Sequence, residues 1–246
     1  MTLTTQGIVL HTTHYGETSL VARIFTRQLG VRSYMLKGIR STQGRNKQNL
    51  LQPMSHLDMT VNENSKNNLQ YIREMHPAAH YNSINTDSVK MALLFFMDEV
   101  LYKSLHDEEP NTKLFDYVVE QIDTLDKTTD GTHSTTLPIE FLLRSSRHLG
   151  IEPMNNYSSH EPLFNLKEGM FTPVSHSTAD TVYTLGAAAS RNMYQCIEGS
   201  LHHQHMPELD ASQRHDTLQS LLHYYQIHLS SFNNFKSHEV LHGVLR

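Results

Sequence analysis

Apolar and polar residues alternate along the first 80 residues in a way that is typical of β-strands. In the segment 19–27, Leu20, Ala22 and Ile24 fall on one set of alternate positions, and Arg23 and Arg27 fall on the other. A period of two indicates a strand with two different faces. Further short runs occupy 7–10, 31–37, 54–61 and 69–75. Five short strands in about 75 residues predict a small closed or nearly closed β-barrel.

From residue 85 onward the apolar spacing becomes that of helices. Val89, Leu93, Phe96 and Val100 recur at helical intervals, and 91–97 carries no charge, which predicts a core helix. We expect further helices after the N-cap Asn111, from Pro138 to about residue 149, over about 180–198, and through 218–229. The stretch 127–136 is expected to be a polar linker.

The segment 151–178 is rich in Pro, Asn and Ser, has no cysteine, and includes a possible hairpin over 163–172. We expect it to be an irregular insert. The predicted fold class is therefore α+β and multidomain: a five-stranded N-terminal barrel over residues 1–80, followed by an α-helical domain over 81–246.

Charge divides the chain in the same way. Residues 1–83 hold nine Lys+Arg against four Asp+Glu, whereas 84–246 hold eleven against twenty-one. No acidic residue lies between Leu20 and His56, where seven basic ones occur. Such an asymmetry favours contact with a nucleic acid or a membrane surface.

The basic residues are interleaved with aromatic ones on the predicted strands. Arg23, Phe25 and Arg27 share one strand face, Arg32 and Tyr34 share a face of the next strand, and a polar loop over 38–49 follows. Cations neutralise phosphates and rings stack on bases, a combination suited to single-strand binding. Basic residues can equally be solvated or protect a sheet edge, and Phe25 can equally be a core residue, since its face is assigned from the pattern alone. The residues that we expect to contact DNA are Arg23, Phe25, Arg27, Arg32, Tyr34, Lys37, Arg40, Arg45 and Lys47.

Several classes of protein are disfavoured. The mean hydropathy is −0.47 and no apolar run approaches 18 residues, so no transmembrane helix is expected. The N-terminus lacks the pattern of a signal peptide, and the single cysteine, Cys196, excludes an internal disulfide, so a cytoplasmic location is expected. The histidines at 202–205 lack the spacing of a helical metal site.

Three kinds of function stay open at this point. The first is a DNA-binding protein that works through the barrel. The second is a protein-interaction adaptor whose barrel and helical groove dock acidic partner tails, with Arg144 and Arg147 on the rim of the groove. The third is a hydrolase, which the absence of a Gly-X-Ser-X-Gly motif or phosphate loop disfavours.

Short motifs along the whole chain resemble the RecO family of bacterial recombination mediators. Each motif is weak alone, but their order and spacing make the match specific. The motifs are Gly7-Ile8-Val9-Leu10, Tyr15-Gly16-Glu17, Phe25-Thr26-Arg27, Leu29-Gly30, Lys37-Gly38-Ile39-Arg40, Leu51-Gln52-Pro53, Leu114-Phe115, Phe141-Leu142-Leu143-Arg144 with Leu149-Gly150 and Pro153, and the tail from Tyr224 to Leu241.

The resemblance implies an N-terminal OB-fold, a helical C-terminal domain and a non-enzymatic role without a cofactor. It implies binding to single- and double-stranded DNA, strand annealing, and loading of a recombinase onto DNA coated by single-strand-binding protein. The implied partners are RecR, RecF and the C-terminal tail of single-strand-binding protein, in a cytoplasmic, nucleoid-associated setting. The motifs assign Arg27, Lys37 and Arg40 to DNA, and Arg144 to the acidic tail.

One departure from the family concerns metal. Many relatives place four cysteines after the Leu-Gly…Pro element to hold zinc, and here 152–176 has none. His160 and His176 alone cannot complete a tetrahedral site. We therefore expect no zinc.

Overall fold

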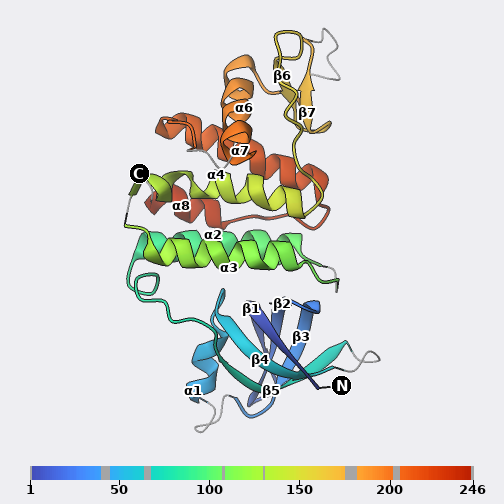
Figure 1. Ribbon diagram of the computed structural model, residues 1–246, viewed down its shortest axis with the longest axis vertical. Helices are drawn as coiled ribbons and strands as arrows, with labels where there is room; N and C mark the ends of the chain where they lie inside the picture. Colours follow the sequence, from blue (N-terminus) through green and yellow to red (C-terminus); the bar gives the residue numbers. More distant parts are fainter. Residues whose placement is uncertain are drawn as a thin grey trace. The chain divides into compact units, whose positions relative to one another are not determined.

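The computed structural model (Figure 1) describes residues 2–39, 45–63, 68–106, 109–129, 131–174, 182–201 and 206–244. Contacts divide the chain into two compact units, 1–128 and 129–246. Among the described residues, the first unit holds the barrel, the short helical segment 45–51 and two long helices, and the second holds four helices and a short hairpin. The domain ranges 1–80 and 81–246 stay a prediction.

The barrel is closed, with the strand order β1-β2-β3-β5-β4. Its strands are β1 (Thr2–Tyr15), β2 (Ser19–Thr26), β3 (Gly30–Leu36), β4 (His56–Asn62) and β5 (Leu69–Pro77). All pairs are antiparallel except β3 with β5, which closes the barrel in parallel. The predicted fold class, a five-stranded barrel followed by helices, is confirmed.

The barrel core is built from the alternating apolar positions. Leu20, Ala22 and Ile24 of β2 are buried with Val9 and Met59 in one cluster. The approach is close at Gly7, where an added Cβ would lie 2.4 Å from Met59 Cε and 2.6 Å from Ile24 Cγ2. Glycine at this position therefore lets β1 pass close to the core.

Part of the predicted loop over 38–49 is helical. The helix α1 (Arg45–Gln48) is followed by a 3-10 turn, η1 (Asn49–Leu51). Leu51 of this turn is 3% exposed and belongs to the barrel core. Burial of this side chain ties the end of the basic segment to the barrel.

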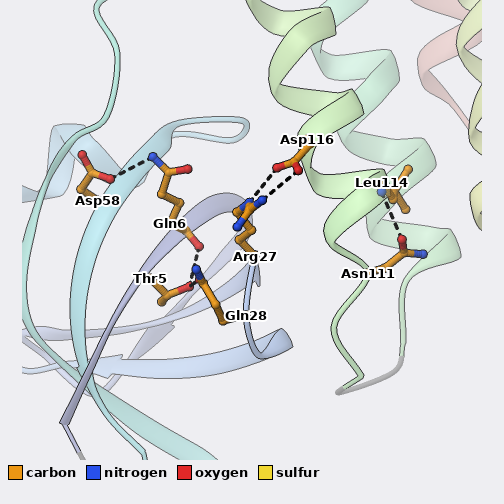
Figure 2. Close-up of polar contacts among 8 residues, drawn as sticks. All are labelled: Thr5, Gln6, Arg27, Gln28, Asp58, Asn111, Leu114 and Asp116. Atoms are coloured by element: carbon orange, nitrogen blue, oxygen red, sulfur yellow. Dashed lines mark hydrogen bonds and ion pairs between the residues drawn. The ribbon is translucent and has the colours of Figure 1, made fainter.

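Two helices complete the first unit: α2 (Ser88–Ser104) and α3 (Thr112–Lys127). The predicted N-cap is confirmed, because the Asn111 side chain accepts a hydrogen bond from Leu114 N at 3.1 Å (Figure 2). At the other end of α3, the Asp126 carboxylate accepts backbone N–H groups from Asn82, Ser83 and Ile84. Asp126 thereby fixes the segment that connects β5 to α2.

The second unit contains α4 (Gly131–His148), α6 (Ala187–Leu201), α7 (Ala211–His228) and α8 (Ser237–Val244). α4 begins seven residues before Pro138, so the predictions of a linker over 127–136 and of Pro138 in the first turn are wrong. Pro138 lacks an N–H, so it gives up one helical hydrogen bond inside α4. The side chains of Leu137, Pro138 and Ile139 are nevertheless buried, which favours the helix at this point.

The predicted hairpin is present as β6 (Leu163–Asn165) and β7 (Met170–Thr172). Phe164 and Phe171 are both 0% exposed, with ring centroids 5.0 Å apart. Tyr157 contacts Phe171 edge-on and stacks on Tyr194 of α6. The Asn156 side chain donates to the Phe171 carbonyl and accepts from its N–H. Packed rings and hydrogen bonds therefore hold the hairpin in the second unit.

Candidate nucleic-acid interface

The outer face of β2 carries Arg23, Phe25 and Arg27, as the alternation predicts, but helices cover much of it. Phe25 is 1% exposed, and its ring contacts the Phe115 ring of α3 at a centroid distance of 5.4 Å. The expectation that Phe25 offers a stacking surface is wrong, because α3 packs on this face of the strand. Phe25 is a core residue.

Arg27 at the end of the same face is paired with an acidic residue. Its Nε and Nη2 donate to the two carboxylate oxygens of Asp116 on α3, at 2.7 and 3.0 Å (Figure 2). The hydrogen bond from Arg27 lowers the pKa of the Asp116 carboxyl group, although the carboxylate stays 54% exposed. A phosphate that binds Arg27 must compete with this carboxylate.

Arg23 contacts the C-terminal end of α2. Its guanidinium donates to the Leu105 carbonyl, lies 5.0 Å from the Tyr102 ring centre and is 3.3 Å from His106 Nδ1. A cation at this end of a helix satisfies carbonyl groups that have no partner within the helix. Arg23 therefore joins α2 to the barrel.

Arg32 and Tyr34 share a face of β3, as predicted, but Tyr34 belongs to the barrel core and both side chains contact Glu63. Arg32 Nε is 3.7 Å from the Glu63 carboxylate, and the Tyr34 hydroxyl donates to it at 3.3 Å. Tyr34 is 0% exposed, and burial, assisted by Glu63, raises the pKa of its hydroxyl. The prediction that Tyr34 presents an exposed ring is therefore wrong.

A different group of basic and aromatic residues surrounds a hollow of about 510 Å³ on the barrel surface. Lys37, Lys47, Tyr71 and Arg73 are its exposed side chains, and none of the described residues that line it is acidic. We call this feature the β3–β5 hollow. Its floor is apolar, with Met35, Leu36, Ile39, Ile72 and Met75.

Strand pairing explains how these residues meet. β3 and β5 pair in parallel through Ser33–Leu69, Tyr34–Gln70 and Met35–Tyr71. Lys37 and Arg73 lie two residues beyond the last pair, where the paired region has ended. The Lys37 ammonium lies 5.5 Å from the centre of the Tyr71 ring, within the range of a cation–π contact. Lys47 reaches the hollow from α1, at the far end of the basic segment.

Two of the predicted contacts cannot be placed. Arg40 lies outside the described residues, and so does the side chain of Arg45, although its backbone begins α1.

Two residues of the hollow, Tyr71 and Arg73, are not among those predicted from the sequence. Their signal was an aromatic and a basic residue at alternate positions of the last strand, but only the parallel closure places that strand beside Lys37.

In the helical unit, both arginines expected on a groove rim contact acidic residues. Arg144 Nη2 is 2.8 Å from Glu140, one turn earlier on α4, and Arg147 Nε is 3.0 Å from Glu152. The structure instead places a groove of about 100 Å³ between α4, α7 and α8. Arg214 and His215 line it together with apolar side chains that include Ile139, Leu218 and Leu241.

The part of the chain that the structure describes shows no group of three or more His, Cys, Asp and Glu residues placed to hold a metal ion. His160 is exposed, whereas His176 and the 202–205 segment fall outside that part. The expected absence of zinc stays a prediction. Across the same described ranges, no helix is long and apolar enough to cross a membrane.

Comparison with known proteins covers both halves of the chain. Residues 1–81 match the family model "Recombination protein O N terminal", and residues 85–238 match "Recombination protein O C terminal". The chain is similar to the "DNA repair protein RecO" of Christiangramia forsetii, with 28% identity over 99% of both chains, and to that of Flavobacterium psychrophilum, with 27% identity over 99% of both. The protein of that name from Phocaeicola vulgatus is 30% identical over 96% of both chains. With the closed barrel followed by helices, these matches show that the chain belongs to the RecO family of DNA repair proteins.

Proposed function

We propose that this chain is a non-enzymatic recombination mediator that binds single- and double-stranded DNA through the β3–β5 hollow. The observation that carries the proposal is the meeting of Lys37, Lys47 and Arg73 around the exposed Tyr71 ring, with no acidic residue among the described lining. Three cations offer contacts to phosphates, and the ring offers a platform for one base. Arg40 and Arg45 stay proposed DNA contacts on the sequence alone, because their side chains lie outside the described residues.

The composition of the hollow favours binding without strong sequence preference. Lys and Arg contacts to phosphates carry no sequence information, and a base of any kind can stack on a tyrosine ring. Three phosphate contacts predict that the logarithm of single-strand affinity falls with the logarithm of salt concentration at a slope of about −2. Tolerance of sequence is what a protein that pairs arbitrary complementary strands requires.

Fluorescence anisotropy with labelled single-stranded and duplex oligonucleotides tests this proposal. Lys37→Glu should weaken binding to both forms, because it places a carboxylate in the hollow. Arg147→Glu is a matched control, because it reverses a charge in the other unit. Equal affinities of wild type and Lys37→Glu at low salt would contradict the proposed site.

The further steps of the proposed function rest on the family membership. Strand annealing, recombinase loading and assembly with RecR, RecF and single-strand-binding protein are proposed because the whole chain matches proteins named for DNA repair. Mixing labelled complementary strands, with and without single-strand-binding protein, measures annealing directly. A protein that binds both strands but never accelerates their pairing would contradict this part alone.

A second candidate is the adaptor that docks acidic partner tails. The groove between α4, α7 and α8 favours it, since Arg214 and His215 stand beside apolar side chains. Arg144 and Arg147, the residues first expected in this role, would have to leave Glu140 and Glu152 to join. Calorimetry with the tail peptide of single-strand-binding protein distinguishes these two docking sites. Loss of peptide binding in Arg214→Glu supports the groove, and loss of peptide binding in Arg144→Glu supports the surface of α4.

A further inference from the structure

Three side chains of the second unit lie together at its surface. Lys167 belongs to the turn between β6 and β7, Tyr183 to the segment before α6, and His223 to α7. The Lys167 ammonium is 6.0 Å from the centre of the Tyr183 ring, and the centres of the Tyr183 and His223 rings are 6.4 Å apart. Lys167 and His223 are exposed, and Tyr183 is partly exposed. We call this group the Lys167 trio.

Main-chain hydrogen bonds hold the backbone beneath the trio. The Tyr183 carbonyl accepts a hydrogen bond from Leu166 N at 2.8 Å, and the Asn165 side chain accepts one from Lys167 N at 2.9 Å. His228 Nε2 lies 2.9 Å from the Leu166 carbonyl oxygen, which ties α7 to the same turn. These contacts do not use the ends of the trio side chains. Replacing one of those side chains should therefore leave the local fold intact.

The trio combines the same kinds of group as the β3–β5 hollow, where the Lys37 ammonium lies 5.5 Å from the centre of the Tyr71 ring. A ring that is open to solvent gives a base a surface on which to stack, and a lysine beside it contacts the neighbouring phosphate. The His223 imidazole adds a nitrogen that donates or accepts a hydrogen bond. This combination suits a nucleotide of a single strand, because the faces of its base are not covered as they are in a duplex.

The charge of the trio differs from that of the hollow. Glu168 follows Lys167 and is also exposed, so it offsets the attraction of the lysine for a phosphate. Stacking on Tyr183 must therefore supply most of the binding free energy, and the trio alone should bind weakly. A weak site contributes when another site of the same chain already holds DNA, because linkage raises the local concentration of the ligand.

We propose that the Lys167 trio is a second contact for single-stranded DNA, with a base on the Tyr183 ring, a phosphate on Lys167 and a hydrogen bond to His223. This inference rests on the proposed DNA binding by the β3–β5 hollow. It places a contact in the part of the chain where acidic residues outnumber basic ones, twenty-one to eleven over 84–246. A chain with two contacts can hold both strands of a pair that it anneals.

Photocrosslinking of the full-length protein tests the site directly. A single strand that carries 5-iodouracil couples under ultraviolet light to a ring that the base touches, and mass spectrometry of the peptides identifies the ring. We expect adducts at Tyr71 and at Tyr183. Lys167→Glu should lower the yield at Tyr183 about fivefold, because it replaces a phosphate contact by repulsion, and should leave the yield at Tyr71 unchanged. Lys236→Glu, which reverses another exposed charge of the second unit, should change neither yield.

Annealing of labelled complementary strands adds a functional measurement. Tyr183→Ala removes the stacking surface and should slow annealing about fivefold, whereas Tyr183→Phe keeps the ring and should anneal like wild type. Anisotropy with one short strand, which the hollow binds more tightly, should give the same affinity for both variants. A purely structural role of Tyr183 would instead lower the melting temperature of Tyr183→Ala, and thermal melting measures this.

The outcomes distinguish the trio from the hollow. If wild type binds no DNA, the proposed function fails and this inference fails with it. Adducts at Tyr71 but none at Tyr183 or His223 would overturn this inference alone, and so would a Tyr183 yield that Lys167→Glu leaves unchanged. An adduct at Tyr183 without one at Tyr71 would support the trio and contradict the hollow. If Tyr183→Ala is unfolded, the yields with Lys167→Glu decide between these outcomes.

Discussion

Two basic regions of the same barrel differ in what surrounds their cations. On the outer face of β2, Arg23 donates to a helix carbonyl and Arg27 to the Asp116 carboxylate. In the β3–β5 hollow, no described residue of the lining supplies an acidic partner to Lys37, Lys47 or Arg73. A charge count along the chain treats the cations of both regions alike. Only the second leaves its cations open to phosphates.

The difference shows how a helix can change the role of a basic strand. α3 places the Phe115 ring on Phe25 and the Asp116 carboxylate on Arg27 through adjacent residues. One helix thus buries the Phe25 ring and pairs the charge of Arg27, both of which the strand pattern predicts to be exposed. Substitutions in the barrel unit test whether this division is correct.

The largest effect is expected from charge reversal in the hollow. Lys37→Glu combined with Lys47→Glu should weaken single-strand binding about a hundredfold at low salt, because two phosphate contacts become repulsive. Arg27→Glu should weaken it far less, since Asp116 already competes for that guanidinium. Anisotropy titrations at several salt concentrations measure both. Equal losses in the two variants would erase the distinction between the regions.

The next effect concerns the ring in the hollow. Tyr71→Ala should lower affinity for single strands about tenfold, because stacking of one base on a ring contributes about 1–3 kcal/mol. Tyr15→Ala is the matched control: Tyr15 is more exposed, at 59% against 43%, but lies outside the hollow. If only Tyr71→Ala lowers the affinity for DNA, the neighbouring cations are required; equal losses in the two variants would show that exposure of the ring is sufficient.

A smaller effect, here a gain in DNA affinity, is expected when Arg27 loses its carboxylate partner on α3. Asp116→Asn should raise DNA affinity by up to about threefold, because Arg27 then has no carboxylate that competes with phosphates. Only salt then screens the interaction of Arg27 with DNA. The same change should reduce the dependence of stability on pH. Arg27 lowers the pKa of Asp116 in the folded protein. The stabilisation by this ion pair is therefore present above the pKa that Asp116 has in the unfolded chain, and it is lost as pH falls through the pKa of Asp116 in the folded protein. Unchanged DNA affinity would mean that Arg27 takes no part in binding.

The smallest effect is on stability and concerns His56. Burial lowers the pKa of this side chain, so its neutral form is favoured in the folded protein. Its contribution is present above the unfolded pKa, near 6.5, and is lost as pH falls through the folded pKa. The difference in melting temperature between wild type and His56→Phe should therefore change between about pH 7 and pH 5. A constant difference across this range would show that His56 is not shifted.

Much of the fold could be predicted because it follows local patterns. The period-two run in β2, the helical spacing in α2 and the Asn111 cap each depend on neighbouring residues. The early start of α4 could not be read in this way. The sequence before Pro138 is polar and lacks a helical stripe, whereas the buried residues that hold α4 come later in the helix.

The sequence predicted the kinds of residue that form the candidate site, but it did not predict all of the residues themselves. The basic segment correctly included Lys37 and Lys47, but not Tyr71 and Arg73, which join through a parallel strand pair more than thirty residues away in sequence. Phe25 and Tyr34 were misassigned for a physical reason. Alternation reports which residues share a face. It does not show that α3 covers the face of Phe25, or that the face of Tyr34 is the inner face of the barrel.

The rings and amide contacts around the β6–β7 hairpin have a consequence for how this region responds to stress. Its described residues are held by Phe164, Phe171 and Tyr157 and by the Asn156 side chain, none of which contains sulfur. Heat and denaturant should therefore open the hairpin together with the helices on which it packs. Oxidants that attack sulfur would have no direct target among these four side chains.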